Sequence, residues 1–318
     1  MPSFIGNSIS LFTEITGNRI MHKGIKIALW ILSALIVLLV LFYISARFLF
    51  REQLEDYVFK VEMEERIDLL RQSGSYAEDV EQYHFTYVQD SCRAHEISQF
   101  FRLDTLLKNT SSDTWNRALT LARFVSGHIP HANQSVYPEK RNAIDLWKYT
   151  QEVEPAFNCR LHSILLHELL LSEGIINRFV TCLPADSLDP DCHVVNLVWL
   201  PEHNKWAMLD SDMQAWASDT EGTPLSLSEM REYYIAGTPI TYHSLLDNTD
   251  DFDYYRSYWA KNLYWFICWE ETGYDKETSP SGQEVVLVPP GFKGFKYRGG
   301  SIFTSDDKRF WAAPDKHL

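Results

Sequence analysis

The longest apolar run in the chain lies near its start. Residues 27–46, IALWILSALIVLLVLFYISA, contain no charged residue, and only Ser33 and Ser45 interrupt the apolar pattern. A helix of this length spans about 30 Å, which matches the hydrocarbon core of a bilayer. The run predicts one membrane-spanning helix over residues 27–50, preceded by a short tail over residues 1–26.

The same run has a second interpretation, a signal peptide that is cleaved. In that case Met21 is the start residue and HKGIK is the basic segment before the apolar core. We favour a retained anchor, because the run is longer than the apolar core of a typical signal peptide and continues as ARFLF. Lys and Arg flank it on both sides and do not fix its orientation. A short tail before a long acidic body favours an extracytoplasmic body.

Charged residues at helical spacing follow the apolar run. Residues 51–74 predict a charged helix that ends at Gly74, within a helical extension over residues 51–110. Two further helices are predicted over residues 112–129, which begin with a Ser-Asp capping pair, and over residues 139–153.

A leucine-rich helix is predicted after Cys159, in the stretch FNCRLHSILLHELLLSEGI. Its Leu and Ile residues spread around most of the helical circumference, which is typical of a central helix buried on most sides. Gly174 is expected to cap its C-terminus. Cys159 therefore lies in or near the first turn.

Three strand-like runs follow, over residues 177–183, 192–200 and 205–210. The last two are separated by Pro-Glu-His-Asn, a polar turn that predicts an antiparallel hairpin. Helices packed on such a sheet predict an α+β fold.

The register of this hairpin decides which side chains meet. If Leu200 pairs with Lys205, Val195 stands opposite Asp210, and His193 shares a face with Val195 because strand side chains alternate. Asp210 then lies diagonally across from His193 and within reach. A shift of one residue would break this arrangement.

Composition and charge narrow the class of protein. The 318 residues are 45% hydrophobic and 14% aromatic, which is typical of a globular chain. The formal net charge of −14 argues against nucleic acid as a partner.

Residues 241–318 are rich in aromatic residues and predict an extension packed on the core. Most of its tryptophans are expected to be core residues, with one a candidate for lining a cleft.

The five cysteines leave two hypotheses open. An odd number fits one free thiol and two pairs in an oxidising compartment, and Cys182 and Cys192 flank a loop between neighbouring strands, where a disulfide could hold it. Alternatively, all the cysteines are structural residues of a scaffold.

One cysteine is placed for chemistry. A thiol at a helix N-terminus lies near unpaired backbone N–H groups, which favour the thiolate. A histidine on the next strand can deprotonate it, and a carboxylate can fix the histidine tautomer. Cys159, His193 and Asp210 supply these parts. Each residue also has an interpretation without chemistry: Cys159 as a core residue, His193 as an ordinary strand residue, and Asp210 as the start of a turn.

The stretches NCRLHSILLHELLLSEGI, CHVVNLVWL and KWAMLDSD resemble the three motifs of the transglutaminase-like superfamily, a papain-like α+β fold. The resemblance implies a core over residues 111–240, with Cys159 as nucleophile, His193 as base and Asp210 as orienting acid. Trp206 matches the tryptophan of the family's third motif and is expected to support the site.

The resemblance has two departures that concern the chemistry. Asn158 precedes the nucleophile where the family usually has Gly, and HVV replaces HAW. Asn158 or the backbone N–H of Cys159 is the candidate oxyanion donor.

The predicted function is thiol-dependent acyl transfer on amide bonds of a protein or peptide, as a peptidase, amidase or transglutaminase at the membrane. The alternative is a catalytically silent module that binds peptide or cell-envelope polymer. No cofactor is implied. A metal site at Cys159, His162 and His167 is disfavoured, because five-residue spacing puts the two histidines on different helix faces.

Overall fold

The computed structural model divides the chain into two compact units, Met1–Val61 and Glu62–Leu318. The structure describes residues 6–247, 252–277, 282–294 and 300–315, without the side chains of residues 6–22 and 24. The first residues of the predicted tail and parts of the predicted C-terminal extension therefore lie outside the described residues.

The first unit contains helix α1 (Gly6–Leu49). Its segment Ile25–Leu49 has a mean hydropathy of 2.9, contains no buried residue and is long and apolar enough to cross a membrane. The helix begins earlier than the predicted span, at Gly6 rather than at residue 27. No proline interrupts residues 6–26, so a helix formed in the apolar run can extend toward the N-terminus.

Helix α2 (Arg51–Gln72) forms as the charged pattern predicts. Gly74 follows it with a φ of +84°, a conformation that glycine adopts without strain. In the second unit, Leu70 of this helix joins the core. Arg66 Nη1 donates a hydrogen bond of 2.6 Å to the carbonyl oxygen of Ser257.

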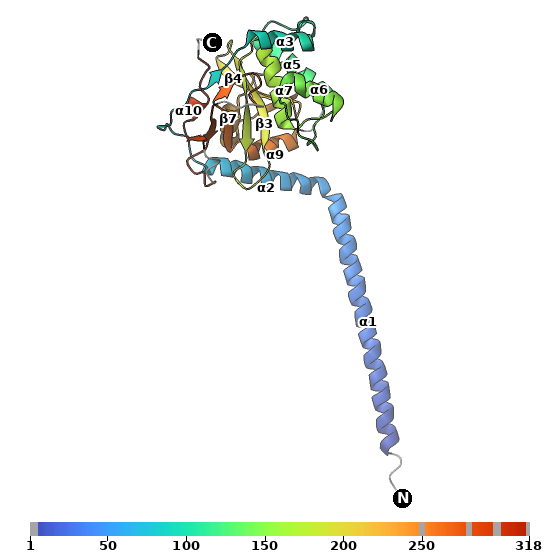
Figure 1. The fold of residues 1–318 in the computed structure, drawn as a ribbon. Coiled ribbons are helices and arrows are strands. Elements are labelled where there is room, and N and C mark those ends of the chain that lie inside the picture. The colour runs from blue at the N-terminus through green and yellow to red at the C-terminus, as the bar shows by residue number, and fades with distance from the viewer. Residues whose placement is uncertain (1–5, 248–251, 278–281, 295–299, 316–318) are drawn as a thin grey trace. The chain divides into compact units, whose positions relative to one another are not determined.

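The other helices lie in the second unit (Figure 1). They are α3 (Ser91–Phe101), α4 (Leu103–Leu106), α5 (Thr114–His128), α6 (Ala143–Glu152), α7 (Cys159–Ser172), α8 (Leu227–Ala236), α9 (Asp253–Asn262) and α10 (Asp307–Phe310). Asp113 caps α5 as predicted. Helix α6 begins at Ala143 rather than at residue 139, because the Asn142 side chain accepts the N–H of Asp145 and so sets the N-terminus there.

One sheet of eight strands organises this unit, in the order β10-β9-β7-β2-β3-β4-β5-β6. The strands are β2 (Asn177–Leu183), β3 (His193–Leu200), β4 (Lys205–Asp210), β5 (Ala215–Ser218), β6 (Thr241–Ser244), β7 (Trp265–Trp269), β9 (Glu284–Leu287) and β10 (Ile302–Thr304). All neighbours are antiparallel except β9 and β10. A separate parallel pair joins β1 (Thr86–Tyr87) and β8 (Glu271–Thr272).

Each face of the sheet has its own core. Helices α3, α5, α6 and α7 bury one face, and α5, α6 and α7 gather on the same side in Figure 1. The other face packs against α8, α9 and the C-terminal segment with α10. Helix α7 is buried along nearly its whole length, and Gly174 follows it with a φ of +71°. The structure is thus a mixed helix and sheet fold with a central helix.

The hairpin of β3 and β4 has the predicted register, with Leu200 paired to Lys205. Strand β3 begins at His193 and β4 ends at Asp210, so both residues lie at the same end of the sheet. The hairpin pattern therefore determines which two ionisable groups meet.

Candidate active site

Cys159 is the first residue of α7 and is half-buried. The preceding residue, Asn158, has an extended backbone, and its Oδ1 accepts the N–H of Leu161 at 3.1 Å. This cap begins the helix at the cysteine and leaves the thiol in the first turn, where backbone N–H groups have no partner within the helix.

His193 and Asp210 form a buried ion pair. His193 Nε2 donates to Asp210 Oδ2 at 2.6 Å. Burial alone would lower the pKa of His193, but the charge and hydrogen bond of Asp210 raise it well above its ordinary value. Burial likewise opposes ionisation of Asp210, yet His193 and further hydrogen bonds hold the pKa of this carboxyl below its ordinary value. An imidazolium and a carboxylate therefore face each other.

The thiol lies beside this pair. Donor atoms of Cys159, His193 and Asp212 are all within 4.8 Å of one another. A hydrogen bond to the Cys159 sulfur also contributes to the raised pKa of His193. Because Asp210 occupies Nε2, the other ring nitrogen, Nδ1, is available to the sulfur.

Helix α9 covers the ion pair and was not assigned to the site by sequence reasoning. Tyr255 Oη donates to Asp210 Oδ2 at 2.9 Å. The rings of Tyr258 and Trp259 pack edge-on against His193, with ring centres 5.4 and 5.5 Å away. The aromatic pattern of this segment predicted core packing, which Trp259 confirms, but it gave no signal for the contact with His193.

A second carboxylate, Asp212, lies two residues after Asp210 and is also buried. Its Oδ1 is 2.8 Å from Nδ1 of His131, whose side chain is 57% exposed, and 3.5 Å from Nε2 of His162. Burial and the charge of Asp210 raise the pKa of Asp212. Burial lowers the pKa of His162 to about 4, so this ring is neutral at physiological pH.

A hollow of about 350 Å³ lies near the site, although Cys159, His193 and Asp210 do not line it themselves. Its lining includes Arg160 and Cys192, the chain neighbours of Cys159 and His193. Much of the rest is apolar and comes from the partly exposed face of β2 and β7, including Phe179. A cavity of this size and composition can accept a small ligand or one peptide side chain.

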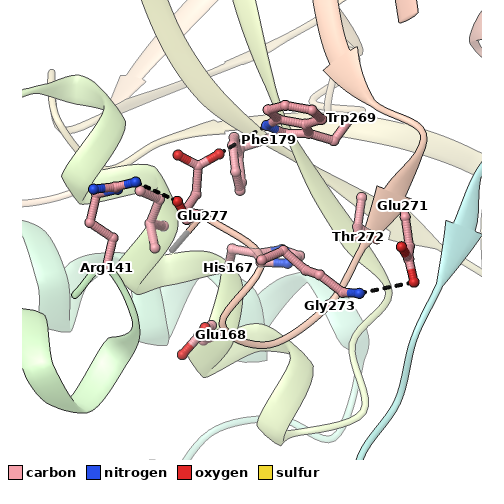
Figure 2. A pocket seen from close by; sticks show the side chains of 11 residues that line it. Arg141, His167, Glu168, Phe179, Trp269, Glu271, Thr272, Gly273 and Glu277 are labelled. Atoms are coloured by element: carbon pink, nitrogen blue, oxygen red, sulfur yellow. Dashed lines mark hydrogen bonds and ion pairs between the residues drawn. The ribbon is translucent and has the colours of Figure 1, made fainter. Parts of the chain in front are cut away.

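A smaller cavity lies beside the middle of α7, where His167 and Glu168 line it together with Glu277 and Trp269 (Figure 2). Trp269 Nε1 donates to Glu277 Oε1 at 2.9 Å. The volume of about 10 Å³ is close to the space that one water needs. It is therefore too small for a substrate.

For two of the predicted site residues, Asn158 and Trp206, the structure shows contacts that stabilise the fold. The Asn158 side-chain oxygen serves as the helix cap, and its role as oxyanion donor stays a prediction. Trp206 donates from Nε1 to the carbonyl oxygen of Ala312 at 3.0 Å and packs on Arg178. It lies four residues before Asp210, about 13 Å along the strand. A role for Trp206 in supporting the site also stays a prediction.

The hypothesis of a disulfide between Cys182 and Cys192 is wrong for this structure, in which all five cysteines are free thiols. Polar contacts from α9 hold the loop before His193 instead. Tyr258 Oη donates to Asp191 Oδ1 at 3.1 Å and to the carbonyl oxygen of Cys192 at 3.2 Å. Lys261 adds an ion pair of 2.8 Å with Asp191.

The described residues also contain a donor set for a metal ion. Cys159, His193 and Asp212 offer sulfur, nitrogen and oxygen within 4.8 Å of one another. This trio differs from the one that the sequence disfavours, Cys159 with His162 and His167. His167 instead bonds Asn177 Oδ1 through Nδ1 at 2.7 Å, away from the thiol.

Comparisons with known proteins add little. No family model matches the chain, and no curated protein matches it. A solved structure described as "a Putative Cysteine Protease from Cytophaga hutchinsonii" is similar at 14% identity and a TM-score of 0.32. The match covers 52% of this chain and 55% of that chain, so this chain spans about half the length of that protein. A likeness of this size does not assign an activity.

Proposed function

We propose that this chain is a cysteine hydrolase or acyltransferase of papain-like, transglutaminase-like type that acts on amide bonds. The observation that carries the proposal is the 2.6 Å hydrogen bond between His193 and Asp210, with the half-buried thiol of Cys159 on the other side of the imidazole. A nucleophile, a base and an orienting carboxylate are thus in series.

The first half of the reaction forms an acyl-enzyme. The Cys159 thiolate attacks the carbonyl carbon of the amide, and the carbonyl oxygen becomes an oxyanion. His193, which holds a proton at Nδ1, gives it to the leaving amine as the C–N bond breaks. Asp210 keeps its bond to Nε2 throughout and stabilises the imidazolium. The backbone N–H of Cys159, with Asn158 as second candidate, is proposed to stabilise the oxyanion.

The second half releases the acyl group. Water or an amine attacks the thioester, His193 takes the proton of the attacking group, and the thiolate leaves. The hollow of about 350 Å³ beside Arg160 and Cys192 is the proposed place for the substrate side chain. Its lining combines apolar side chains with the charged Arg160 and Glu284, and so suits a side chain that has an apolar body and a polar end.

The test is acylation by an activated ester. Purified full-length protein is mixed with p-nitrophenyl acetate, and the burst of p-nitrophenolate is followed while mass spectrometry locates the acetyl group. We expect one acetyl group on Cys159 and no burst in Cys159→Ser. Cys92→Ser is the control, because Cys92 is the exposed thiol and takes no part in the site. An added primary amine then separates hydrolysis from transfer.

Acetylation of other thiols, or a burst that survives Cys159→Ser, would contradict the proposal. A Cys159 that stays unmodified would instead favour a silent module that binds peptide or cell-envelope polymer.

We further propose that α1 is a retained single-span anchor with the body on the extracytoplasmic side. Its exposed apolar segment of 25 residues supports the span. Full-length protein should remain in the membrane after alkaline carbonate extraction. External protease should degrade the body and spare a tag on Met1; a soluble form that begins near Arg47 would show cleavage instead.

A further inference from the structure

The candidate active site contains one more acid than acyl transfer requires. Asp210 already orients His193, whereas Asp212 lies on the side of the thiol, with a carboxylate oxygen within 4.8 Å of the donor atoms of Cys159 and His193. A carboxylate so close to a sulfur nucleophile would repel the thiolate that the reaction needs. Its position therefore calls for a separate explanation.

The groups around the thiol are mostly acidic. Two aspartates, Asp210 and Asp212, lie close to His193, and one of them already holds this histidine by a hydrogen bond. Arg160, the next residue after Cys159, is held by Glu277 through contacts of 3.0 and 3.1 Å.

Two further histidines lie near Asp212. His131 Nδ1 is 2.8 Å and His162 Nε2 is 3.5 Å from Asp212 Oδ1. Among the described residues, neither ring nitrogen of the buried His162 has a hydrogen-bond partner of good geometry. Thiol, imidazole and carboxyl groups therefore gather at this centre, as they do around a bound cation.

The donor atoms suit one kind of cation. Thiolate, imidazole and carboxylate together are typical ligands of Zn²⁺, with bonds of about 2.0–2.3 Å that set tetrahedral ligand atoms about 3.3–3.8 Å apart. The present separations, all within 4.8 Å, exceed these values by no more than about 1–1.5 Å.

The surroundings of two donors match those of metal ligands. Metal-bound histidines usually donate their second ring nitrogen to a carboxylate, as His193 does to Asp210. Asp212 is in turn held by His131 at 2.8 Å. The three donors also come from three separate elements, the start of α7, the start of β3 and the turn after β4, so the fold itself brings them together.

We propose that Cys159, His193 Nδ1 and Asp212 form a Zn²⁺ site that reversibly blocks the nucleophile. The fourth position is left to water. When Zn²⁺ binds the thiolate and the imidazolium, the Nδ1 proton of His193 is released to solvent and both groups become ligands. The sulfur electron pair that would attack the carbonyl carbon is then engaged by the metal. The binding stands on the donor geometry, while the block rests on the proposed function.

The experiment uses full-length protein in the Cys92→Ser background, stripped of metal and titrated with Zn²⁺ against a chromophoric chelator. We expect one Zn²⁺ per chain, and at least ten-fold weaker binding in Asp212→Asn. The matched control is Asp104→Asn, an exposed aspartate on α4, which should bind as tightly as the parent. Co²⁺ in place of Zn²⁺ should give a sulfur-to-metal charge-transfer band that Cys159→Ser removes.

A second measurement separates loss of the metal site from loss of the fold. Iodoacetamide should alkylate Cys159 in metal-free Asp212→Asn at least as fast as in the parent. Zn²⁺ should slow alkylation in the parent and much less in the variant. Equal Zn²⁺ affinity in the two proteins, or binding that leaves the alkylation of Cys159 unchanged, would overturn the inference.

These outcomes are distinct from those for acyl transfer. A chain that binds Zn²⁺ through Cys159 but never forms an acyl-enzyme keeps the metal site and loses the proposed activity. A chain that forms the acyl-enzyme without protection by Zn²⁺ keeps the activity and loses the metal site.

Discussion

Helix α7 has buried ionisable side chains in two regions. Its first turn holds Cys159 next to His193 and Asp210, and its third turn holds His167 and Glu168. Both regions shift pKa values: burial lowers that of His167 and raises that of Glu168 to about 7. Shifted pKa values thus occur in both regions and do not distinguish the two.

The partners of these groups make the difference. Glu168 accepts the backbone N–H groups of Ala143 and Asp275, both at 2.7 Å, and so ties two loops to the helix. His167 is bonded to Asn177. In the first turn, by contrast, His193 faces a charged carboxylate on one side and a thiol on the other.

The two regions also differ in the size of the nearby cavity. Figure 2 shows His167 and Glu168 beside a cavity of about 10 Å³, whereas the hollow next to Arg160 and Cys192 holds about 350 Å³. Groups whose partners are backbone and amide atoms in a closed space serve stability. Groups that converge on a half-exposed nucleophile beside an open hollow can serve chemistry.

The largest expected effect is on the acylation rate, when His193, the proposed base, is removed. His193→Ala should lower the acylation rate of Cys159 by p-nitrophenyl acetate about 10³-fold, because general base catalysis contributes about 10²–10⁴-fold. Alkylation by iodoacetamide at pH 6 should also slow, because the imidazolium no longer stabilises the thiolate.

The matched control for this prediction is His167→Gln. His167 lies eight residues along α7 from Cys159, about 12 Å away, and should change either rate by no more than about threefold per folded molecule. Near-ultraviolet circular dichroism checks folding. Equal losses in the two variants would remove the distinction between the two regions.

The residues of the first region were predictable because each signal is local. A capped leucine-rich helix begins at Cys159, and a four-residue turn sets the register that brings Asp210 to His193. Alternation along the strands then decides which face each side chain occupies.

The contacts of α9 with His193 and Asp210 were not predictable from the sequence. Tyr255 donates a hydrogen bond to Asp210, from which it is separated by 45 positions in the sequence. An aromatic-rich segment predicts that its side chains are buried, but it does not predict which residues they contact. His131 lies in an irregular segment and pairs with Phe157 through an isolated bridge. Such contacts depend on how whole elements dock, which no local pattern encodes. The disulfide hypothesis failed because the register of β2 and β3 pairs Cys182 with His193 and not with Cys192.

The next expected effect concerns the stability of the second region. The folded pKa of Glu168 is about 7, above its unfolded value of about 4.5, so the folded state holds more protons between these pH values. Stability should therefore fall as pH rises from 4.5 to 7, by about 3 kcal/mol from this group. Glu168→Gln cannot titrate and should lose that part of the pH dependence.

Denaturant unfolding at pH 5 and pH 8 measures this effect as the difference between parent and variant. The variant should also be less stable at pH 5, by about 1–3 kcal/mol, because its amide nitrogen would meet a backbone N–H. The control is Glu152→Gln, an exposed glutamate on α6. A pH dependence that survives in Glu168→Gln would show that this carboxyl is ionised at all these pH values.

The smallest expected effect tests whether α9 acts on the reactive region through Asp210. Tyr255→Phe removes one hydrogen bond of 2.9 Å from this carboxylate and leaves those from His193 and two backbone N–H groups. Burial favours the protonated acid and the Tyr255 bond opposes it, so the pKa of Asp210 should rise without the hydroxyl. The acid limb of the acylation rate should then move to higher pH by about half a unit to one unit, while the rate at neutral pH changes little because Asp210 stays ionised there. The matched control is Tyr258→Phe, since its hydroxyl contacts Asp191 and not Asp210 and its loss should leave the acid limb in place. The same shift in both variants would mean that α9 supports the loop rather than the carboxylate, and no shift in Tyr255→Phe would mean that Asp210 stays ionised without its tyrosine.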